Sequence, residues 1–167
     1  MLLDTGWRFR LGDQENAFEK NFSDADWREV ALPHDWSVEY PKDRNLSSGT
    51  GYVVGGTAWY RRHFTLPAGA KGKKIFLCFD GIYKNSQVWI NGYYLGRRPN
   101  GYISFRYDIT DFLVFGDTSA NIAGCTSTYR TGLSCSSRAA ASRPDTLNCS
   151  DAEGTALPFP EPALRAK

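Results

Sequence analysis

The sequence predicts an all-β fold, an antiparallel β-sandwich built from short strands. Two observations carry this prediction. The run Lys74–Phe79 is apolar on both of its alternating faces, which is typical of a central strand covered on each side. Asn91-Gly92 separates two strand-like runs at 87–90 and 93–96, and a type I′ hairpin turn favours these residues because it needs positive φ at both central positions.

The other expected strands follow the chain in order. Trp7–Leu11 alternates aromatic side chains with arginines, so it predicts a half-buried strand. Residues 59–66 predict a longer strand, in which Arg62 interrupts an apolar face and indicates a sheet edge or a paired arginine. Residues 30–32 and 103–107 are also expected to be extended. Short strands separated by turn residues, with almost no helical periodicity, favour a β-sandwich.

Turn and loop signals separate these strands. Ser23 and Asp24 can cap a short turn, and residues 67–72 predict a turn into the central strand. The stretch 40–56, with its glycines and a proline, predicts a long irregular loop. Residues 108–111 predict a cap on a short helical turn.

Length and composition bound the function classes. At 167 residues the chain can hold one ordinary domain, and its 41% hydrophobic and 14% aromatic content is ample for a packed core. The formal net charge is +2 and the basic residues form no stripe, which disfavours nucleic acid as a partner. No apolar run approaches the roughly 20 residues of a membrane span. Residues 1–4 show no signal peptide, so the chain as written is expected to be cytoplasmic and without a membrane partner.

The composition changes sharply after Asp117. Of the 5 Trp, 9 Tyr and 10 Phe residues, only Tyr129 and Phe159 lie beyond it, and Ser, Thr, Ala, Gly and Pro dominate the remainder. Such a segment buries too little apolar surface to offset roughly 1–2 kcal/mol of backbone entropy per residue. We therefore expect a folded unit at 1–117, incomplete at its C-terminal strand, and a disordered or non-native tail at 118–167.

The four cysteines indicate no metal site. Cys78 lies in the expected central strand, where a buried thiol is the ordinary interpretation. Cys125, Cys135 and Cys149 fit no zinc spacing, because they form no Cys-x-x-Cys pair and no histidine follows position 63. No cofactor is expected in this chain.

Four sequence motifs occur in a fixed order over about residues 5–117. They are Leu-Pro-His-Asp-Trp at 32–36, Gly-Gly-Thr-Ala-Trp-Tyr-Arg-Arg at 55–62, Phe-Asp-Gly-Ile-Tyr at 79–83 with Val-Trp-Ile-Asn-Gly at 88–92, and Gly-Tyr-Ile-Ser-Phe at 101–105 with Tyr-Asp-Ile-Thr at 107–110. In order and spacing they resemble the opening domain of family 2 glycoside hydrolases of the β-galactosidase type.

The resemblance implies a jelly-roll, galactose-binding-like sandwich that forms the N-terminal sugar-binding domain of a longer enzyme. In that family an immunoglobulin-like domain and a TIM barrel follow, and the barrel carries two catalytic glutamates. The implied ligand of such a parent enzyme is a carbohydrate of the β-galactoside class, with magnesium or sodium bound mainly by barrel residues. The sugar specificity stays open, because β-glucuronidases and β-mannosidases share this domain.

The chain departs from the family pattern after Asp117, where the family continues with an apolar strand that closes the sandwich. Our hypothesis is a frameshift or an annotation truncation just after codon 117, and an evolved linker is the alternative. The first interpretation of function is a non-catalytic β-sandwich domain of a β-galactosidase-type enzyme. The alternatives are a freestanding carbohydrate-binding module and an inert fragment whose missing strand leaves an apolar sheet edge.

No catalytic residues are expected in this chain. Glycoside hydrolysis generally needs two carboxyl groups about 5 Å apart for retention or roughly 6.5–9.5 Å apart for inversion. No pair of acids here indicates that geometry: Asp24 and Asp26 lie in an expected turn, and Asp108 and Asp111 resemble helix caps.

Four residues are candidates for sugar binding. Asp80 matches the family position whose carboxylate can reach the barrel's active site and contact the sugar; the alternative is a cap on the turn at Gly81. His34 and Asp35 are adjacent in a loop, and fixing that loop by hydrogen bonds is the alternative to a catalytic dyad. Trp36 could join a sugar-stacking platform, and packing in the core or at a domain interface is its alternative. The other aromatic members of that platform would be Trp59, Trp89, Tyr83 and Tyr102.

Overall fold

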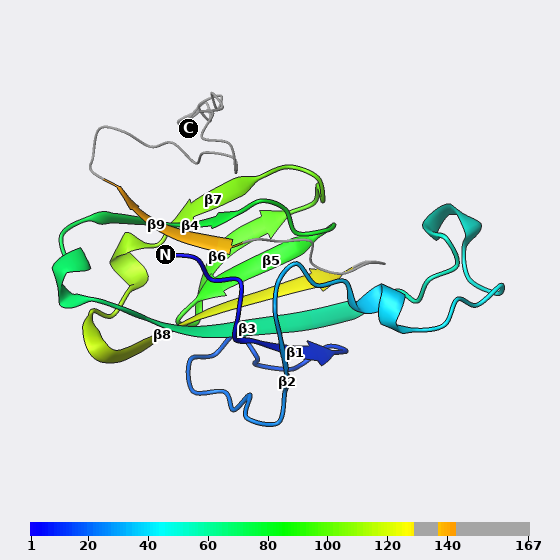
Figure 1. Ribbon diagram of the computed structural model, residues 1–167, viewed down its shortest axis with the longest axis horizontal. Coiled ribbons are helices and arrows are strands. Elements are labelled where there is room, and N and C mark those ends of the chain that lie inside the picture. The colour runs from blue at the N-terminus through cyan, green and yellow to red at the C-terminus, as the bar shows by residue number, and fades with distance from the viewer. Residues whose placement is uncertain (129–136, 143–167) are drawn as a thin grey trace, which may run out of the picture.

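Two antiparallel β-sheets pack against each other in the computed structural model, which describes residues 1–128 and 137–142 (Figure 1). The larger sheet has six strands in the order β2-β1-β3-β8-β5-β6, and the smaller sheet has three in the order β7-β4-β9. All strand pairs are antiparallel. The expected all-β antiparallel fold is confirmed.

The strands are short, apart from two long partners at the centre of the larger sheet. Their bounds are β1 Trp7–Leu11, β2 Arg28–Val30, β3 Thr57–Leu66, β4 Lys74–Phe79, β5 Ser86–Ile90, β6 Tyr93–Arg98, β7 Phe105–Asp108, β8 Gly116–Thr128 and β9 Ser137–Ser142. The helical elements of the described residues are 3₁₀ turns: η1 Trp36–Glu39, η2 Ser48–Thr50, η3 Ala68–Ala70 and η4 Thr110–Phe112.

The two observations that predicted the fold are confirmed by the structure. β4 lies in the middle of the smaller sheet, paired with β7 on one side and β9 on the other. The β5–β6 hairpin turns at Asn91 and Gly92, whose φ angles are 50° and 89°. Positive φ at both positions is what a type I′ turn requires. Cys78 is buried in β4, as expected.

A single apolar core fills the space between the two sheets. The larger sheet contributes Trp7, Phe9, Tyr60, Phe64, Val88 and Ile90, and the smaller sheet contributes Ile75, Leu77, Phe79 and Phe105. A second cluster lies on the opposite face of the larger sheet, where Trp59 packs with Ala17 and Trp27. Side chains alternate along a strand, so β3 sends Tyr60 into the first cluster and Trp59 into the second. The segment between β1 and β2 therefore covers the outer face of the larger sheet.

β8 overturns the expectation that the sandwich lacks its closing strand. It lies between β3 and β5 and pairs with both, in the middle of the larger sheet. Residues 118–128 lie in β8 and residues 137–142 form β9, so the expected boundary at 117 falls inside a strand. Tyr129, Phe159, Cys135 and Cys149 lie outside the described residues.

β8 is hard to recognise from the sequence because most of its side chains are small. Gly124 is aligned with Arg61 of β3 and Trp89 of β5, where large neighbours already fill the outer face. A Cβ on Gly124 would stand 4.0 Å from the carbonyl oxygen of Ala17, directly under the covering segment. The strand is therefore stabilised by the apolar side chains of its neighbours and by ladder hydrogen bonds, which hydropathy along the chain does not show.

Asn121 ties the beginning of β8 into the sandwich. Its side chain is completely buried (0% exposed), and its Nδ2 donates to the Val114 carbonyl over 2.7 Å. Its Oδ1 accepts from the Val114 amide (2.8 Å) and from Asn91 Nδ2 (2.9 Å). The Asn91 Oδ1 in turn accepts from the Ile122 amide over 2.9 Å. A buried amide is tolerated only when its polar atoms are satisfied, so Asn121 and Ile122 fit this fold specifically.

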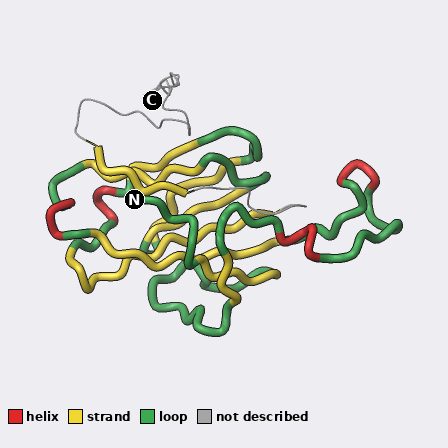
Figure 2. Tube along the Cα trace, viewed as in Figure 1, coloured by secondary structure: helices red, strands yellow, loops and turns green. Residues whose placement is uncertain are grey.

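The expected irregular loop at 40–56 projects beyond the sheets (Figure 2). The η1 turn directly precedes this loop and η2 lies within it, and the backbone amide of Asp43 donates to the Tyr52 carbonyl (3.0 Å). In the described residues no helix has the length and apolar character needed to cross a membrane.

Candidate functional site

Two loops meet where β4 leads to β5 and β6 leads to β7. Gly101 lies so close to the other loop that a Cβ there would stand 2.7 Å from the Lys84 amide nitrogen and 2.8 Å from the Tyr83 ring. Only glycine allows backbones to approach this closely without a shift. The Asn85 amide also donates to the Pro99 carbonyl over 3.4 Å. The two loops therefore form one surface, named here the loop pair 80–85 and 99–104.

Asp80 lies in this loop pair and is exposed. Its backbone carbonyl accepts a hydrogen bond from the Ser104 hydroxyl over 3.0 Å, which fixes the main chain. Within residues 1–128 and 137–142, no ion pair or hydrogen bond engages its carboxylate. The expected alternative, a carboxylate cap on the Gly81 turn, is therefore absent from this part of the chain, and the carboxylate is exposed to solvent.

Two aromatic side chains lie on the same loop pair as Asp80. The Tyr83 and Tyr102 rings make an edge-to-face contact with centroids 5.5 Å apart. Tyr102 is 80% exposed and its neighbour Ile103 is 50% exposed. An accessible aromatic ring and an exposed carboxylate on one pair of loops suit a sugar, because a ring stacks on the apolar face of a pyranoside and an acid accepts hydroxyl hydrogen bonds.

The tryptophans expected in a stacking platform are occupied by other contacts. Trp36 is 1% exposed and belongs to the core, which matches the packing alternative rather than the stacking platform. Trp59 is buried, and the half-buried Trp89 stacks on it with centroids 5.1 Å apart. Phe18 stacks on Trp89 as well, 6.1 Å away. Of the five aromatic candidates, Tyr83 and Tyr102 meet at the loop pair.

Asp35 and His34 fix the loop that leads into η1. Asp35 is the N-cap of η1, since its Oδ1 accepts from the Ser37 amide (2.9 Å) and the Ser37 hydroxyl (2.7 Å). His34 Nδ1 lies 2.8 Å from the Tyr60 hydroxyl. The structural alternative weighed for these two residues matches these contacts.

His34 also belongs to a polar cluster with Arg28 and Glu39. Its Nε2 lies 3.0 Å from Glu39 Oε1 and 3.0 Å from Arg28 Nη2, and Arg28 forms an ion pair with Glu39 at 2.8 Å. Nε2 either donates to Glu39 or accepts from Arg28, and Nδ1 takes the complementary role at Tyr60. Burial opposes ionisation of Glu39, but hydrogen bonds from Arg28 and His34 outweigh it and hold the Glu39 pKa below its ordinary value.

A buried ion pair holds the segment that covers the outer face of the larger sheet. Arg61 is 0% exposed, and its Nε donates to Asp24 Oδ2 over 2.8 Å. Its other nitrogens donate to the backbone carbonyls of Ala17, Glu19 (3.1 Å) and Phe22 (3.2 Å). No local sequence pattern indicates this role of Arg61, because its partners lie some 40 residues earlier in the chain.

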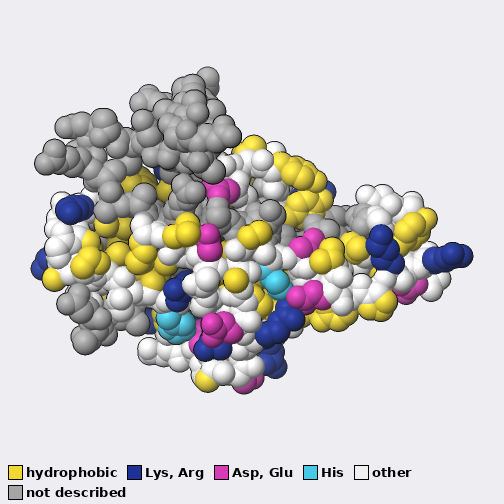
Figure 3. Space-filling view, viewed as in Figure 1, with side chains coloured by type: hydrophobic (Ala, Val, Ile, Leu, Met, Phe, Trp, Pro, Cys, Tyr) yellow, Lys and Arg dark blue, Asp and Glu magenta, His cyan; other side chains and the backbone are white. Residues whose placement is uncertain are grey.

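His63 shares the carboxylate of Asp24, with Nε2 at 2.7 Å from Oδ2. Burial opposes ionisation of Asp24, and the hydrogen bonds from Arg61 and His63 outweigh it, so the Asp24 pKa lies below its ordinary value of 3.8. Figure 3 shows both histidines of the chain on one face, each beside acidic and basic side chains. Both clusters are ion-paired structural contacts.

Asp24, Glu39 and Asp108 are unsuited to acid–base catalysis of glycoside cleavage. A general acid for that reaction needs a raised pKa and a second carboxylate across the bond. Asp24, Glu39 and Asp108 instead have lowered pKa values; burial opposes each shift, and hydrogen bonds from Arg61, Arg28 and Thr110, respectively, outweigh it. In the described residues, no group of three histidine, cysteine or acidic side chains is placed to hold a metal ion.

Comparisons with known proteins agree with this architecture. The family model described as glycosyl hydrolases family 2, sugar binding domain, matches residues 1–133. A β-galactosidase of Bacteroides ovatus, BoGH2A, is 47% identical over 109 residues, which cover 64% of this chain and 13% of that protein. A putative β-glucuronidase of Formosa agariphila is 44% identical over 115 residues, or 68% of this chain and 11% of that protein.

Solved structures show the same fold. A β-glycosidase from Bacteroides vulgatus superposes with a TM-score of 0.77 and 37% identity, covering 86% of this chain and 20% of the other. A glycosyl hydrolase family 2 member from Bacteroides cellulosilyticus gives a TM-score of 0.74 at 31% identity, with the same coverage of both chains.

The fold thus defines an antiparallel β-sandwich of the kind found in family 2 glycosidases. The chain belongs to the sugar-binding domain family of the family 2 glycosyl hydrolases. It spans 11–13% of the length of the two curated relatives described above.

Proposed function

We propose that this chain is a non-catalytic sugar-binding domain of a β-galactosidase-type glycosidase, which contacts the substrate of the parent enzyme through the loop pair 80–85 and 99–104. The observation that carries the proposal is the exposed Asp80 carboxylate, held in position by its backbone but unengaged among the described residues. Its neighbours Tyr83 and Tyr102 offer aromatic surface for the sugar ring.

The contacts of three acids support the non-catalytic role. Asp24, Glu39 and Asp108 are committed to Arg61, Arg28 and Lys74. Asp80 would act as a binding group, and the two carboxyl groups that cleave the bond would come from a further domain, as the family resemblance implies. Magnesium or sodium, where the parent enzyme uses one, would bind there too.

Sugar binding is tested by saturation-transfer NMR of the full chain with methyl β-galactoside. Asp80→Asn is expected to lower the signal strongly, because it removes charge-assisted hydrogen bonds to sugar hydroxyls. Asp111→Asn is the matched control, since Asp111 is exposed on η4, next to the start of β4 rather than its end. Equal signals from Asp80→Asn and the unmodified chain would contradict the assignment of Asp80.

Absence of catalysis is tested separately with nitrophenyl β-galactoside and nitrophenyl β-glucuronide. We expect no release of nitrophenol above the buffer rate from the chain alone. Turnover that survives Asp80→Asn would show a catalytic pair elsewhere and would overturn the non-catalytic role.

A freestanding carbohydrate-binding module is the second candidate, and the 80% exposure of Tyr102 favours it. This candidate predicts retention of the chain on a galactoside or glucan column. Retention should then be lost in Tyr102→Ala, whereas the buried Trp36 cannot serve as the stacking residue. A domain that contributes only part of a shared site should pass through such a column without delay.

The inert-fragment interpretation depended on a missing closing strand, and β8 now occupies the centre of the sheet. We retain a frameshift as a hypothesis but place it beyond Ile122, because Asn121 and Ile122 make specific hydrogen bonds in the fold. Translation of the coding DNA in all three frames tests this: a family-like apolar continuation in another frame supports it, and stops in both other frames would exclude it.

A further inference from the structure

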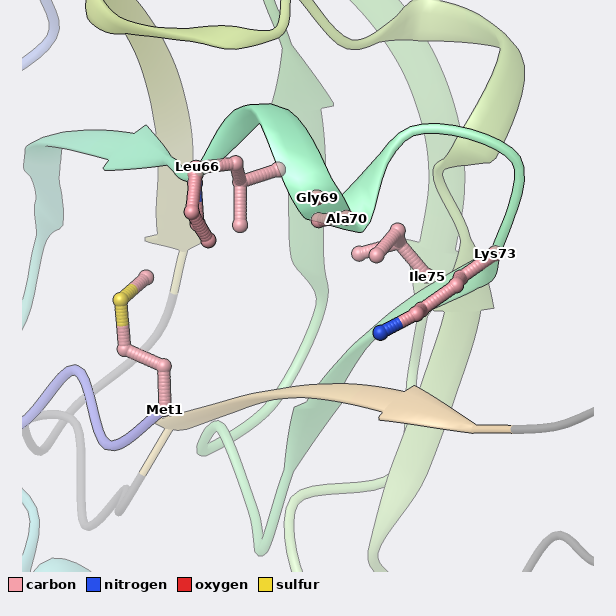
Figure 4. A pocket seen from close by; sticks show the side chains of 7 residues that line it. Met1, Leu66, Gly69, Ala70, Lys73 and Ile75 are labelled. Atoms are coloured by element: carbon pink, nitrogen blue, oxygen red, sulfur yellow. The ribbon is translucent and has the colours of Figure 1, made fainter.

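Two hollows share Met1 in their walls, away from the loop pair that carries the proposed function. The first, of about 390 Å³, is lined by Met1, Leu66, Ala70 and Ile75, with Lys73 as the charged residue of its lining (Figure 4). The second, of about 340 Å³, is lined by residues 1–3 and by residues 62–65 of β3. The second hollow differs in kind, because the guanidinium of Arg62 forms part of its wall.

Arg62 is partly withdrawn from water without the partners that an arginine normally has. Its Nε is buried and, within the described residues, has no hydrogen-bond partner. Its Nη1 donates to the backbone carbonyl of His63. Burial lowers the Arg62 pKa, as expected for a guanidinium removed from solvent.

The fold makes room for this guanidinium at Gly6. A Cβ on Gly6 would stand 3.1 Å from both Cζ and Nη1 of Arg62, and the Gly6 φ of 73° also disfavours a side chain there. Glu29 raises the Arg62 pKa, but its carboxylate pairs with Arg8, at 3.5 Å between Nη2 and Oε2. No ion pair joins Arg62 to an acid in the part of the chain that the structure describes. Arg62 thus lines the hollow, and its Nε has no acceptor among the described residues.

We propose that the hollow lined by residues 1–3 and 62–65 binds a small organic carboxylate with a short aliphatic chain, and that Arg62 holds its carboxyl group. A guanidinium is the best side-chain partner for a carboxylate, because its planar donors match the two oxygens. Leu2, Leu3 and Phe64 supply apolar walls for the chain. A volume of about 340 Å³ is at the lower end of ligand pockets, which suits a ligand of a few carbons.

The test is a ¹H–¹⁵N NMR titration of the full chain with hexanoate, with hexanol as the uncharged probe of matched length. We expect saturable shifts with hexanoate and binding at least about tenfold weaker with hexanol, because a charge-assisted hydrogen bond contributes that much. Arg62→Gln should weaken hexanoate binding by a similar factor. Arg97→Gln is the matched control, since Arg97 is exposed on β6 and bonds Asn85 at 2.7 Å.

Arg62→Lys keeps the readout valid if Arg62→Gln fails to fold. It retains the charge but loses the planar set of donors, so hexanoate binding should fall to a value between those of the unmodified chain and Arg62→Gln. The proposal is overturned if hexanoate gives no saturable shifts, if hexanol binds as well as hexanoate, or if neither Arg62 variant alters binding.

Discussion

Arg61 and Arg62 are neighbours on β3, yet their environments are opposite. Arg61 is completely buried on the outer face of the larger sheet and donates to Asp24 and three backbone carbonyls. Arg62 shares the face of Tyr60 and Phe64, and its buried Nε has no partner among the described residues. This difference separates two roles for an arginine in a strand. An arginine whose hydrogen bonds are all accepted by the chain stabilises the fold, whereas an arginine that lacks acceptors in the chain is available to bind a ligand.

The largest expected effect is at Arg61. Arg61→Leu should lower the free energy of unfolding by about 3–5 kcal/mol, because three backbone carbonyls would lose their donor and the carboxylate of Asp24 would keep only His63 as its partner among the described side chains. Chemical denaturation measures this, with Arg62→Leu as the comparison. If Arg61→Leu does not fold, Arg61→Lys should still be clearly destabilised. If Arg61→Leu lowers the free energy of unfolding no more than Arg62→Leu does, the two arginines do not differ in their contribution to stability and the comparison is wrong.

The next effect is at Asn121, a second buried polar group whose acceptors and donors are all supplied by the chain. Asn121→Ala should lower the free energy of unfolding by about 1–3 kcal/mol, because the Val114 amide and carbonyl lose their partner. Thermal unfolding followed by circular dichroism measures it. A neutral result would indicate that β8 contributes little to the folded unit.

Asp24, the ion-pair partner of Arg61, should make the stability of the fold depend on pH. Because the pKa of Asp24 is lowered in the folded chain, its stabilisation is fully present above its ordinary value of 3.8 and is lost as pH falls through the lower folded pKa. The unfolding temperature should therefore drop below about pH 4, and Asp24→Asn should remove part of that slope. If the unfolding temperature of Asp24→Asn depends on pH in the same way as that of the unmodified chain, folding does not lower the pKa of Asp24.

The smallest expected effect is at Arg62. Arg62→Leu should change the free energy of unfolding by less than about 1 kcal/mol, since removing an unpaired buried charge is often neutral or stabilising. Denaturant unfolding with Arg97→Gln as the surface control measures it. A loss of several kcal/mol would mean that Arg62 has a structural partner, and would remove the reason to assign it a ligand.

Much of the fold could be predicted from local sequence patterns. The strand Lys74–Phe79 and the turn at Asn91 and Gly92 followed from apolar alternation and the demand for positive φ, which are properties of neighbouring residues. The strand Trp7–Leu11 has the bounds that alternation indicated.

What the sequence did not show depends on contacts between distant segments. β8 is a strand because β3 and β5 lie on either side of it and pair with it, although Gly124 and Cys125 of this strand are small residues. The burial of Trp36 and the role of Arg61 likewise depend on segments far along the chain. For the candidate site, the motifs singled out Asp80, but the meeting of Tyr83 with Tyr102 required the close approach at Gly101.

The most direct test of the proposed function is to follow the tyrosine ring signals of the full chain by NMR during titration with methyl β-galactoside. Sugar binding at the loop pair 80–85 and 99–104 predicts that the Tyr83 and Tyr102 rings shift together in the unmodified chain and not in Asp80→Asn. Tyr93 and Tyr94 are the internal controls, because they are exposed on β6, outside the loop pair. Shifts confined to Tyr93 and Tyr94, or shifts that persist unchanged in Asp80→Asn, would contradict it.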